Sequence, residues 1–112
     1  MIYHVQAKFR SGTAKSLLDK LTDGTIKKQR PDGAELVASM NRAVVNENGN
    51  VEWSETCFCP SPLHHERTTV LDHHFDEITT DPIDSLTTYR GRPFMEFLAE
   101  SAQMEPTTQD PE

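Results

Sequence analysis

The fold is decided by residues 34–59, which read AELVASMNRAVVNENGNVEWSETCFC. Two strand-like runs, residues 34–45 and 51–59, flank a short polar segment that contains Asn48 and Gly49. An Asn-Gly pair supplies the positive φ angles that a two-residue type I′ turn requires. The stretch therefore predicts a β-hairpin.

With Asn48-Gly49 as the loop, the pairing of the two strands follows by counting. Val44 then lies opposite Trp53, and Arg42 lies opposite Glu55. An aromatic ring facing a β-branched residue and a cation facing an anion are both favourable cross-strand pairs. The Arg42–Glu55 pair is interpreted as structural, with anion binding by Arg42 as the alternative.

Working outward, the flanking elements follow from hydrophobic periodicity. Residues 14–23 and 62–74 predict helices, residues 75–83 predict a strand, and residues 93–102 predict a final helix. Residues 2–9 alternate as in a strand with one face on the core. Its apolar face consists of Tyr3, Val5, Ala7 and Phe9.

The resulting order, β-α-β-β-α-β plus a C-terminal helix, predicts an α+β fold. It is the ferredoxin-like arrangement: an antiparallel sheet with both helices on one face and the first strand beside the third. Residues 1–102 are expected to form a single domain. Residues 103–112 are acidic, hold two prolines and no aromatic residue, and are expected to be disordered.

Composition excludes several function classes. The chain has 112 residues with 18 acidic and 11 basic side chains, a formal net charge of −7. Nucleic acid is a poor partner for this balance, because phosphate binding requires cations on one face. No run approaches the ~18 apolar residues of a membrane span, and residues 1–8 lack signal-peptide features. Two cysteines are too few for a disulfide framework, so a reducing cytoplasm is the expected location.

Three features resemble one group within this architecture, the dimeric α/β-barrel proteins. They are the opening Ile2-Tyr3-His4-Val5, the Asn48-Gly49 hairpin and the late strand 75–83. Over residues 1–83 the chain is similar to muconolactone isomerase-like and antibiotic-biosynthesis monooxygenase-like small proteins. The resemblance implies a homodimer whose two sheets enclose a pocket, and it carries over no active-site residue.

The second face of the predicted sheet holds the candidate site. His4 is the candidate catalytic residue, since an imidazole exchanges protons near neutral pH. The candidate ligand-binding residues are Gln6, Ser39, Asn41, Ser54 and Thr56. The face is either covered by a partner and structural, or a ligand pocket, or solvated. A cofactor-independent isomerase or monooxygenase acting on a small organic acid or ring is one function that fits. A non-catalytic ligand-binding or dimeric interaction module is the alternative.

Three further features have ordinary explanations. Metal binding is not predicted, because the spacing of Cys57, Cys59, His64, His65, His73 and His74 departs from that of structural zinc sites. Residues 89–93 (YRGRP) either form an anion-binding loop or only connect two elements. Phe94 and Phe97 need an apolar groove, in their own chain or in a partner, and a homodimer is therefore expected.

Overall fold

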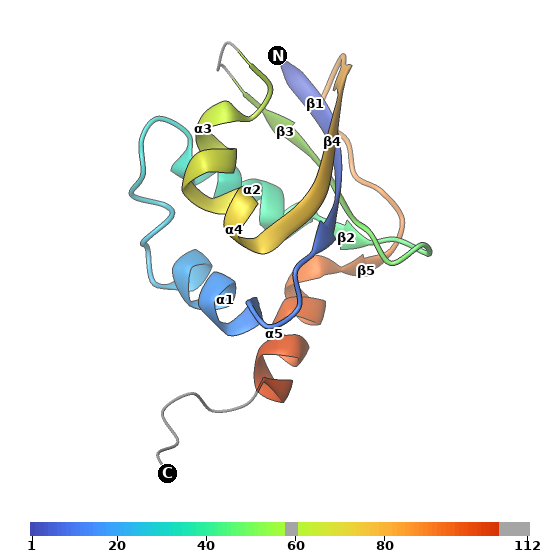
Figure 1. Ribbon diagram of the computed structural model, residues 1–112. Coiled ribbons are helices and arrows are strands. Elements are labelled where there is room, and N and C mark those ends of the chain that lie inside the picture. The colour runs from blue at the N-terminus through green and yellow to red at the C-terminus, as the bar shows by residue number, and fades with distance from the viewer. Residues whose placement is uncertain (58–60, 106–112) are drawn as a thin grey trace.

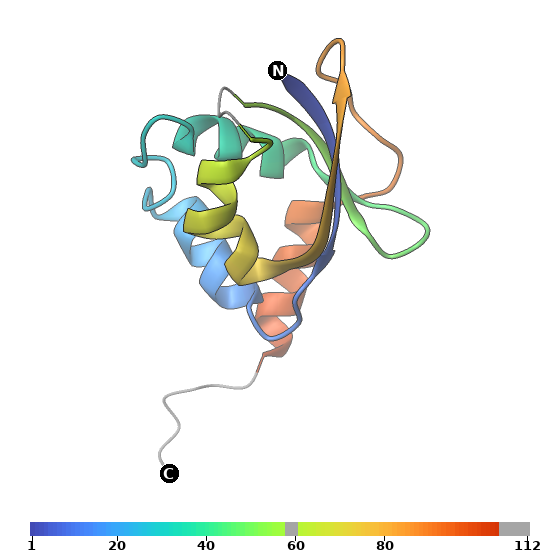
Figure 2. The same cartoon turned by 45° about the horizontal axis from the view of Figure 1, so that its top comes forward.

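The computed structural model describes residues 1–57 and 61–105 and shows an α+β domain with one antiparallel sheet (Figure 1). In chain order the elements are β1 (Ile2–Phe9), α1 (Ala14–Thr22), α2 (Gly33–Arg42), β2 (Val44–Val45), β3 (Val51–Thr56), α3 (His64–Glu66), a π-helical turn η1 (Arg67–Leu71), α4 (Asp72–His74), β4 (Phe75–Ile83), β5 (Arg92–Pro93) and α5 (Phe94–Met104). The strands lie in the order β4-β1-β3-β2-β5. Helices α1 and α2 and the α3–α4 segment lie on one side of the sheet (Figures 1 and 2).

Strand β1 lies between β3 and β4 and confirms the prediction for residues 2–9. Its alternate residues Tyr3, Val5 and Ala7 are buried against the helices. The residues between them, His4 and Gln6, belong to the opposite, outer face of the sheet. The first strand therefore lies beside the third, as the sequence indicated.

The prediction of a strand over residues 34–45 is wrong. Residues Gly33–Arg42 form α2, and only Val44–Val45 pair as a strand. Leu36 and Met40 lie four residues apart on one helical face, and both are buried. Ala34, Glu35 and Leu36 are also good helix formers. The helix is therefore favoured both by local propensity and by burial of the face that holds Leu36 and Met40.

The hairpin exists, but its pairing is shifted by one residue from the prediction. Val44 pairs with Glu52 instead of Trp53, and Val45 pairs with Val51. The Asn46 amide donates to the Asn50 carbonyl, which leaves a three-residue loop closed by Gly49 at φ +82°. Three-residue loops of this kind end on a left-handed residue, and glycine adopts that conformation without strain.

The C-terminal half follows the predicted pattern closely. A helical segment runs from His64 to His74 and leads directly into β4 at Phe75–Ile83. The segment begins two residues after the predicted start, because Leu63 adopts a left-handed conformation with φ 56°. Leu63, Val70, Leu71 and His74 form its buried stripe, as expected.

Helix α5 packs on its own chain, against α1. The Phe94 ring is fully buried, and the Phe9 ring centroid lies 5.8 Å from those of Phe94 and Phe97. The groove required by these phenylalanines is therefore intramolecular. Helix α5 extends to Met104, so the first two residues of the expected disordered tail 103–112 are helical; residues 106–112 lie outside the described part.

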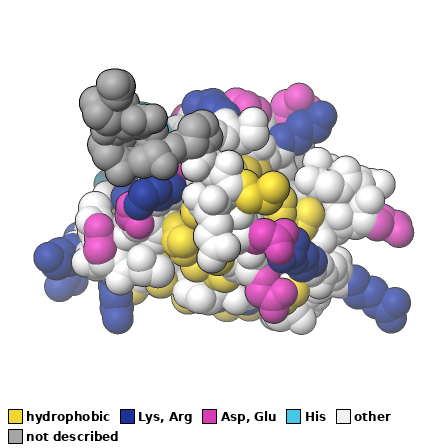
Figure 3. Space-filling model, turned by 90° about the horizontal axis from the view of Figure 1, so that it is seen from below, with side chains coloured by type: hydrophobic (Ala, Val, Ile, Leu, Met, Phe, Trp, Pro, Cys, Tyr) yellow, Lys and Arg dark blue, Asp and Glu magenta, His cyan; other side chains and the backbone are white. Residues whose placement is uncertain are grey.

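Some apolar surface remains on the underside of the molecule. Figure 3 shows hydrophobic side chains gathered in the centre of this face, with acidic and basic side chains around them. A shallow apolar groove of about 310 Å³ lies there, and its walls include Phe9, Phe97 and Met104. Among the helices in residues 1–57 and 61–105, none has the length and apolar character needed to cross a bilayer.

Candidate functional site

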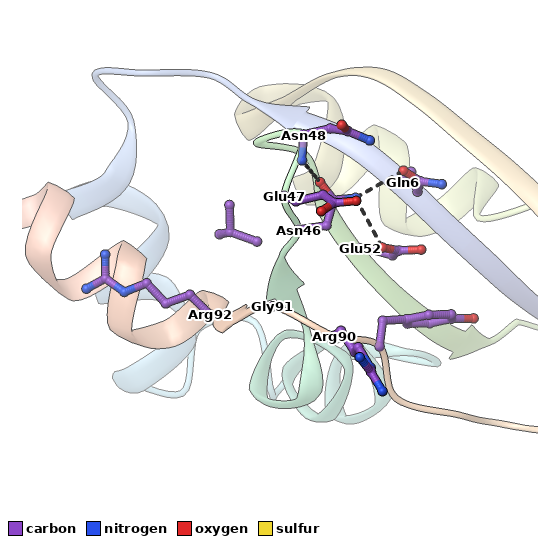
Figure 4. Close-up of a pocket in the computed structure, with 10 residues that line it drawn as sticks. Gln6, Asn46, Glu47, Asn48, Glu52, Arg90, Gly91 and Arg92 are labelled. Atoms are coloured by element: carbon purple, nitrogen blue, oxygen red, sulfur yellow. Dashed lines mark hydrogen bonds between the residues drawn. The ribbon is translucent and has the colours of Figure 1, made fainter.

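A cleft lies on the outer face of the sheet. It has a volume of about 720 Å³ and opens between the β2–β3 hairpin and the segment that precedes β5 (Figure 4). Its walls include Gln6, Asn46, Glu47, Glu52, Tyr89 and Arg90. Strand pairing places Gln6 opposite Glu52, so β1 and β3 together form the floor.

A histidine–carboxylate pair lies beside this cleft: Glu52 lines it, whereas His4 is not among its lining residues. His4 Nε2 is 2.6 Å from Glu52 Oε2, and 24% of the His4 side chain is exposed. The imidazole stacks on the Tyr89 ring, with centroids 4.5 Å apart and planes 20° apart. Burial, and then the charge of Glu52, raise the pKa of the Tyr89 hydroxyl above its usual value.

Asn46 connects the hairpin turn to this pair. Its Nδ2 donates to Glu52 Oε1 over 3.1 Å and to Gln6 Oε1 over 3.4 Å. Its Oδ1 accepts the backbone N–H groups of Asn48 and Asn50, each over 3.0 Å. One carboxylate oxygen of Glu52 is thus held by the turn and the other binds His4, which fixes the carboxylate in place.

Residues 84–91, here called the strap, cross the outer face above β1 and β3. Ser54 is fully buried beneath them, and its Oγ donates to the Thr87 carbonyl over 2.6 Å. The Thr87 N–H donates back to the same Oγ over 3.0 Å. Gly91 is packed so closely that an added Cβ would lie 2.2 Å from the Val45 carbonyl oxygen. The chain itself therefore covers the middle of the face.

The two arginines near the cleft differ in their partners. Arg92 Nη1 lies 3.2 Å from Glu100 and Arg92 Nε lies 3.9 Å from Glu96, both on α5. Figure 4 shows the Arg92 side chain extended away from Gln6 and toward α5. Arg90 is exposed and has no ion pair within the described residues. Of the two arginines in the segment 89–93, which was considered as an anion-binding loop, Arg90 is thus the one available to bind a ligand.

The structure brings together only part of the predicted residue set. His4, Gln6, Ser54 and Thr56 lie on β1 and β3, where the sequence placed them. Gln6 lines the cleft. Ser54 is occupied by the strap, and the backbone N–H of Thr56 donates to Glu35 over 2.9 Å.

The placement of Ser39 and Asn41 on the sheet face is wrong, because both belong to α2. Ser39 is buried and lies 3.2 Å from the Arg42 guanidinium. Asn41 is exposed and donates to the Val37 carbonyl one helical turn earlier. Neither residue is among those that line the cleft.

The predicted Arg42–Glu55 pair is also replaced. Arg42 lies 2.7 Å from Glu35 and donates to the Ser54 carbonyl. Glu55 is fully buried and accepts the Trp53 indole N–H over 2.8 Å. Burial, and then a hydrogen bond with the buried carboxyl of Glu66, raise the pKa of Glu55 well above its ordinary value.

Among the described residues, Cys57 and the histidines of this set have separate partners. His65 Nδ1 lies 2.8 Å from Asp32, and His74 Nε2 lies 3.3 Å from Lys20. Cys57 is buried beside Glu66. Within residues 1–57 and 61–105, no group of three or more His, Cys, Asp or Glu side chains could hold a metal ion, and Cys59 lies outside that part.

The sequence analysis missed three residues of the site: Asn46, Glu52 and Tyr89. Glu52 shares a face with Ser54 and Thr56 by strand alternation, and the β1–β3 pairing, which sets Gln6 opposite Glu52, brings it beside His4. Tyr89 lies in the segment that the sequence leaves as either an anion-binding loop or a connector, and its stacking on His4 spans 85 positions of the chain. The signal for the histidine–carboxylate pair is an acidic residue on the strand next to β1, on the same face of the sheet as His4.

Comparisons with known proteins add no family. No protein-family model matches the chain, and neither a curated protein nor a solved structure matches it. Function is therefore inferred from the geometry of the outer face.

Proposed function

We propose that this protein binds a small organic acid or ring compound in the outer-face cleft and exchanges a proton with it through His4. The observation that carries the proposal is the 2.6 Å contact between His4 Nε2 and Oε2 of Glu52, a residue that lines the cleft. A carboxylate behind an imidazole is the arrangement by which proteins orient a histidine base. The reaction class is a cofactor-independent isomerase, or a monooxygenase that uses dioxygen as its second substrate.

The chemistry follows from the hydrogen bond. Glu52 accepts the Nε2–H proton, so the neutral ring presents the lone pair of its other nitrogen, Nδ1. A proton taken by Nδ1 from a carbon next to a carbonyl group makes an imidazolium, whose charge Glu52 offsets. Returning the proton to a different carbon completes an isomerisation. Arg90, which lines the cleft and has no ion pair to any described residue, is the candidate partner for a ligand carboxylate.

Deuterium incorporation tests this function directly. The protein is incubated in deuterated buffer with a panel of small keto acids and enolisable ring compounds, and exchange at carbon is followed by NMR. His4→Gln removes the base and should abolish the exchange, while Glu52→Gln should slow it by roughly 100-fold. His73→Gln, a change at an exposed histidine, is the matched control and should have no effect.

Two results would count against the enzyme. Exchange that persists in His4→Gln would remove the assigned base. Binding of panel compounds by wild type and His4→Gln alike, without exchange, would leave a ligand-binding module in place of an enzyme.

A non-catalytic, dimeric interaction module is the second candidate, and the apolar groove on the underside favours it. Met104, one of its walls, is 80% exposed and extends the apolar surface that a second copy could cover. Light scattering should then give twice the monomer mass of 12.7 kDa. Met104→Glu should return the monomer, whereas Leu86→Glu, at another exposed apolar residue, should not. A monomer at millimolar wild-type protein would eliminate this candidate.

The ferredoxin-like relationship, the dimeric barrel and the cytoplasmic location are part of the same proposal. The antiparallel order β4-β1-β3-β2 supports a ferredoxin-like relationship, with α2 occupying most of the expected second strand. A dimeric α/β barrel would place two outer faces together, and the strap would then lie between the sheets. The low cysteine content supports a cytoplasmic location.

A further inference from the structure

We infer that the strap, residues 84–91, is a removable cover over His4 and that Ser54 is the residue that latches it. The inference rests on the proposed function for its purpose, because a cover matters only if His4 meets a ligand. Its physical basis is independent of any ligand. That basis is the small number of contacts that hold the strap, together with its position over Ser54 and His4.

Both ends of the strap are anchored in the sheet. At one end the chain leaves β4, whose Ile83 pairs with Ile2 on β1. At the other end Arg92 pairs with Val45, and Gly91 lies against the Val45 backbone at a distance that leaves no room for a side chain. The ends therefore stay in place when the middle moves.

The middle of the strap is held by two interactions. Ser54 Oγ exchanges two hydrogen bonds with the Thr87 backbone, and the Tyr89 ring stacks on His4. Among the described residues, no other hydrogen bond joins residues 84–90 to the sheet. Leu86, the large apolar side chain of the strap, is 44% exposed instead of packed. Segments with few buried apolar contacts open at low free energy.

Opening would extend the cleft toward His4. The strap now covers Ser54, which is the strand partner of His4, and Tyr89 covers one face of the imidazole. In the closed state 24% of the His4 side chain reaches solvent. Moving Thr87 and Tyr89 away would join the region above His4 and Ser54 to the existing cleft beside Glu52. Ser54 is thus a positioning residue, which acts on His4 through the strap.

Two measurements on the full-length chain test the inference without a ligand. Hydrogen exchange reports the opening of the Thr87 N–H, and acylation by diethyl pyrocarbonate, followed by mass spectrometry, reports access to His4. If one motion controls both, wild-type His4 should react more slowly than the exposed His73. Ser54→Ala, which removes both strap hydrogen bonds, should speed Thr87 exchange and His4 acylation together, each by roughly five- to tenfold. Ser16→Ala, at an exposed serine on α1, is the matched control and should change neither rate.

The inference is overturned if His4 in the wild type reacts as fast as His73 while the Thr87 N–H stays protected. It is also overturned if Ser54→Ala speeds Thr87 exchange and leaves His4 acylation unchanged. The wild-type comparison decides the matter even if Ser54→Ala folds poorly. Neither readout involves a substrate, so failure here is separate from failure of the deuterium-exchange test.

Discussion

Glu55 is a carboxyl group that folding places in the core. It is fully buried, with the Trp53 indole on one oxygen and the Glu66 carboxyl as a second neighbour. Two adjacent buried carboxyls favour sharing a proton over carrying two negative charges. Desolvation is the leading reason that the pKa of Glu55 is raised well above its ordinary value.

A raised pKa has a definite consequence for stability. Folding favours protonated Glu55, so its contribution is fully present below the unfolded pKa and is lost as pH rises through the folded pKa. Glu55→Gln keeps the shape and a hydrogen-bond donor without the charge. We expect it to stabilise the protein by about 2 kcal/mol at pH 8 and much less at pH 4.5, measured by urea unfolding. Exposed Glu47→Gln is the control, and an equal effect of Glu55→Gln at both pH values would contradict the assignment.

His74 gives the opposite pH dependence. Its ring is 2% exposed, its Nε2 faces Lys20 Nζ, and its Nδ1 has no hydrogen-bond partner within the described residues. Burial lowers the pKa of His74 to about 4, with the charges of Lys20, His73 and Arg10 acting in the same direction. The native state therefore holds His74 neutral where the unfolded chain would protonate it.

The expected result is a loss of stability on acidification. Because the folded pKa is depressed, the loss occurs as pH falls from about 6.5 to about 4 and amounts to at most about 3.4 kcal/mol. His74→Gln should remove this part of the slope in urea unfolding between pH 7 and pH 4.5. The control is His73→Gln, at the exposed neighbouring histidine, which should leave this part of the slope unchanged. An unchanged slope in His74→Gln would contradict the assignment, because it would show that His74 binds the same number of protons in the folded and unfolded states.

At the scale of the element, α1 is capped from the far end of the chain. The residue at its N-cap position, Thr13, makes no side-chain capping bond. The Glu105 carboxylate instead accepts the backbone N–H groups of Ala14 and Lys15, the latter over 3.2 Å. A carboxylate there satisfies two unpaired N–H groups and complements the positive end of the helix.

This cap predicts a stability effect at a residue close to the C-terminus. Glu105→Ala should lower the free energy of unfolding by about 1 kcal/mol, since a helix cap typically contributes that much. Glu105→Gln should lose less, because the amide oxygen still accepts one bond. Glu47→Ala, at an exposed glutamate outside the helices, should change little. If the two alanine variants unfold alike in urea, the cap contributes nothing in solution.

The elements also differ in how far local sequence determines them. Strand β1 and the stripe Leu63–Leu71 have clear periods of two and of three to four residues, and the structure follows both. The run before the hairpin is apolar at short intervals that fit either a strand or a helix. Leu36 and Met40 are buried from a helix, and only the space available between the sheet and α5 decides this.

At the scale of the whole molecule, the candidate site is assembled from three distant parts of the chain. His4, Glu52 and Tyr89 come from β1, β3 and the strap. The sequence placed His4, Gln6 and Ser54 on one face of the sheet, because alternation in a strand is a local property. The contacts of Glu52 and Tyr89 with His4 depended on the pairing of β1 with β3 and on the path of a loop, which are not local.

The sequence by itself determined the α+β class, the core face of β1, the first helix, the helical stripe ending at His74 and the strand that follows. Each has a periodicity that one window of residues reveals. The tertiary structure decided that residues 33–42 form a helix, that Val44 pairs with Glu52, and that Tyr89 lies on His4. The physical reason is that these outcomes depend on which surfaces are buried against each other. A one-residue change of register moves every side chain to the opposite face, and only contacts across the whole fold penalise it.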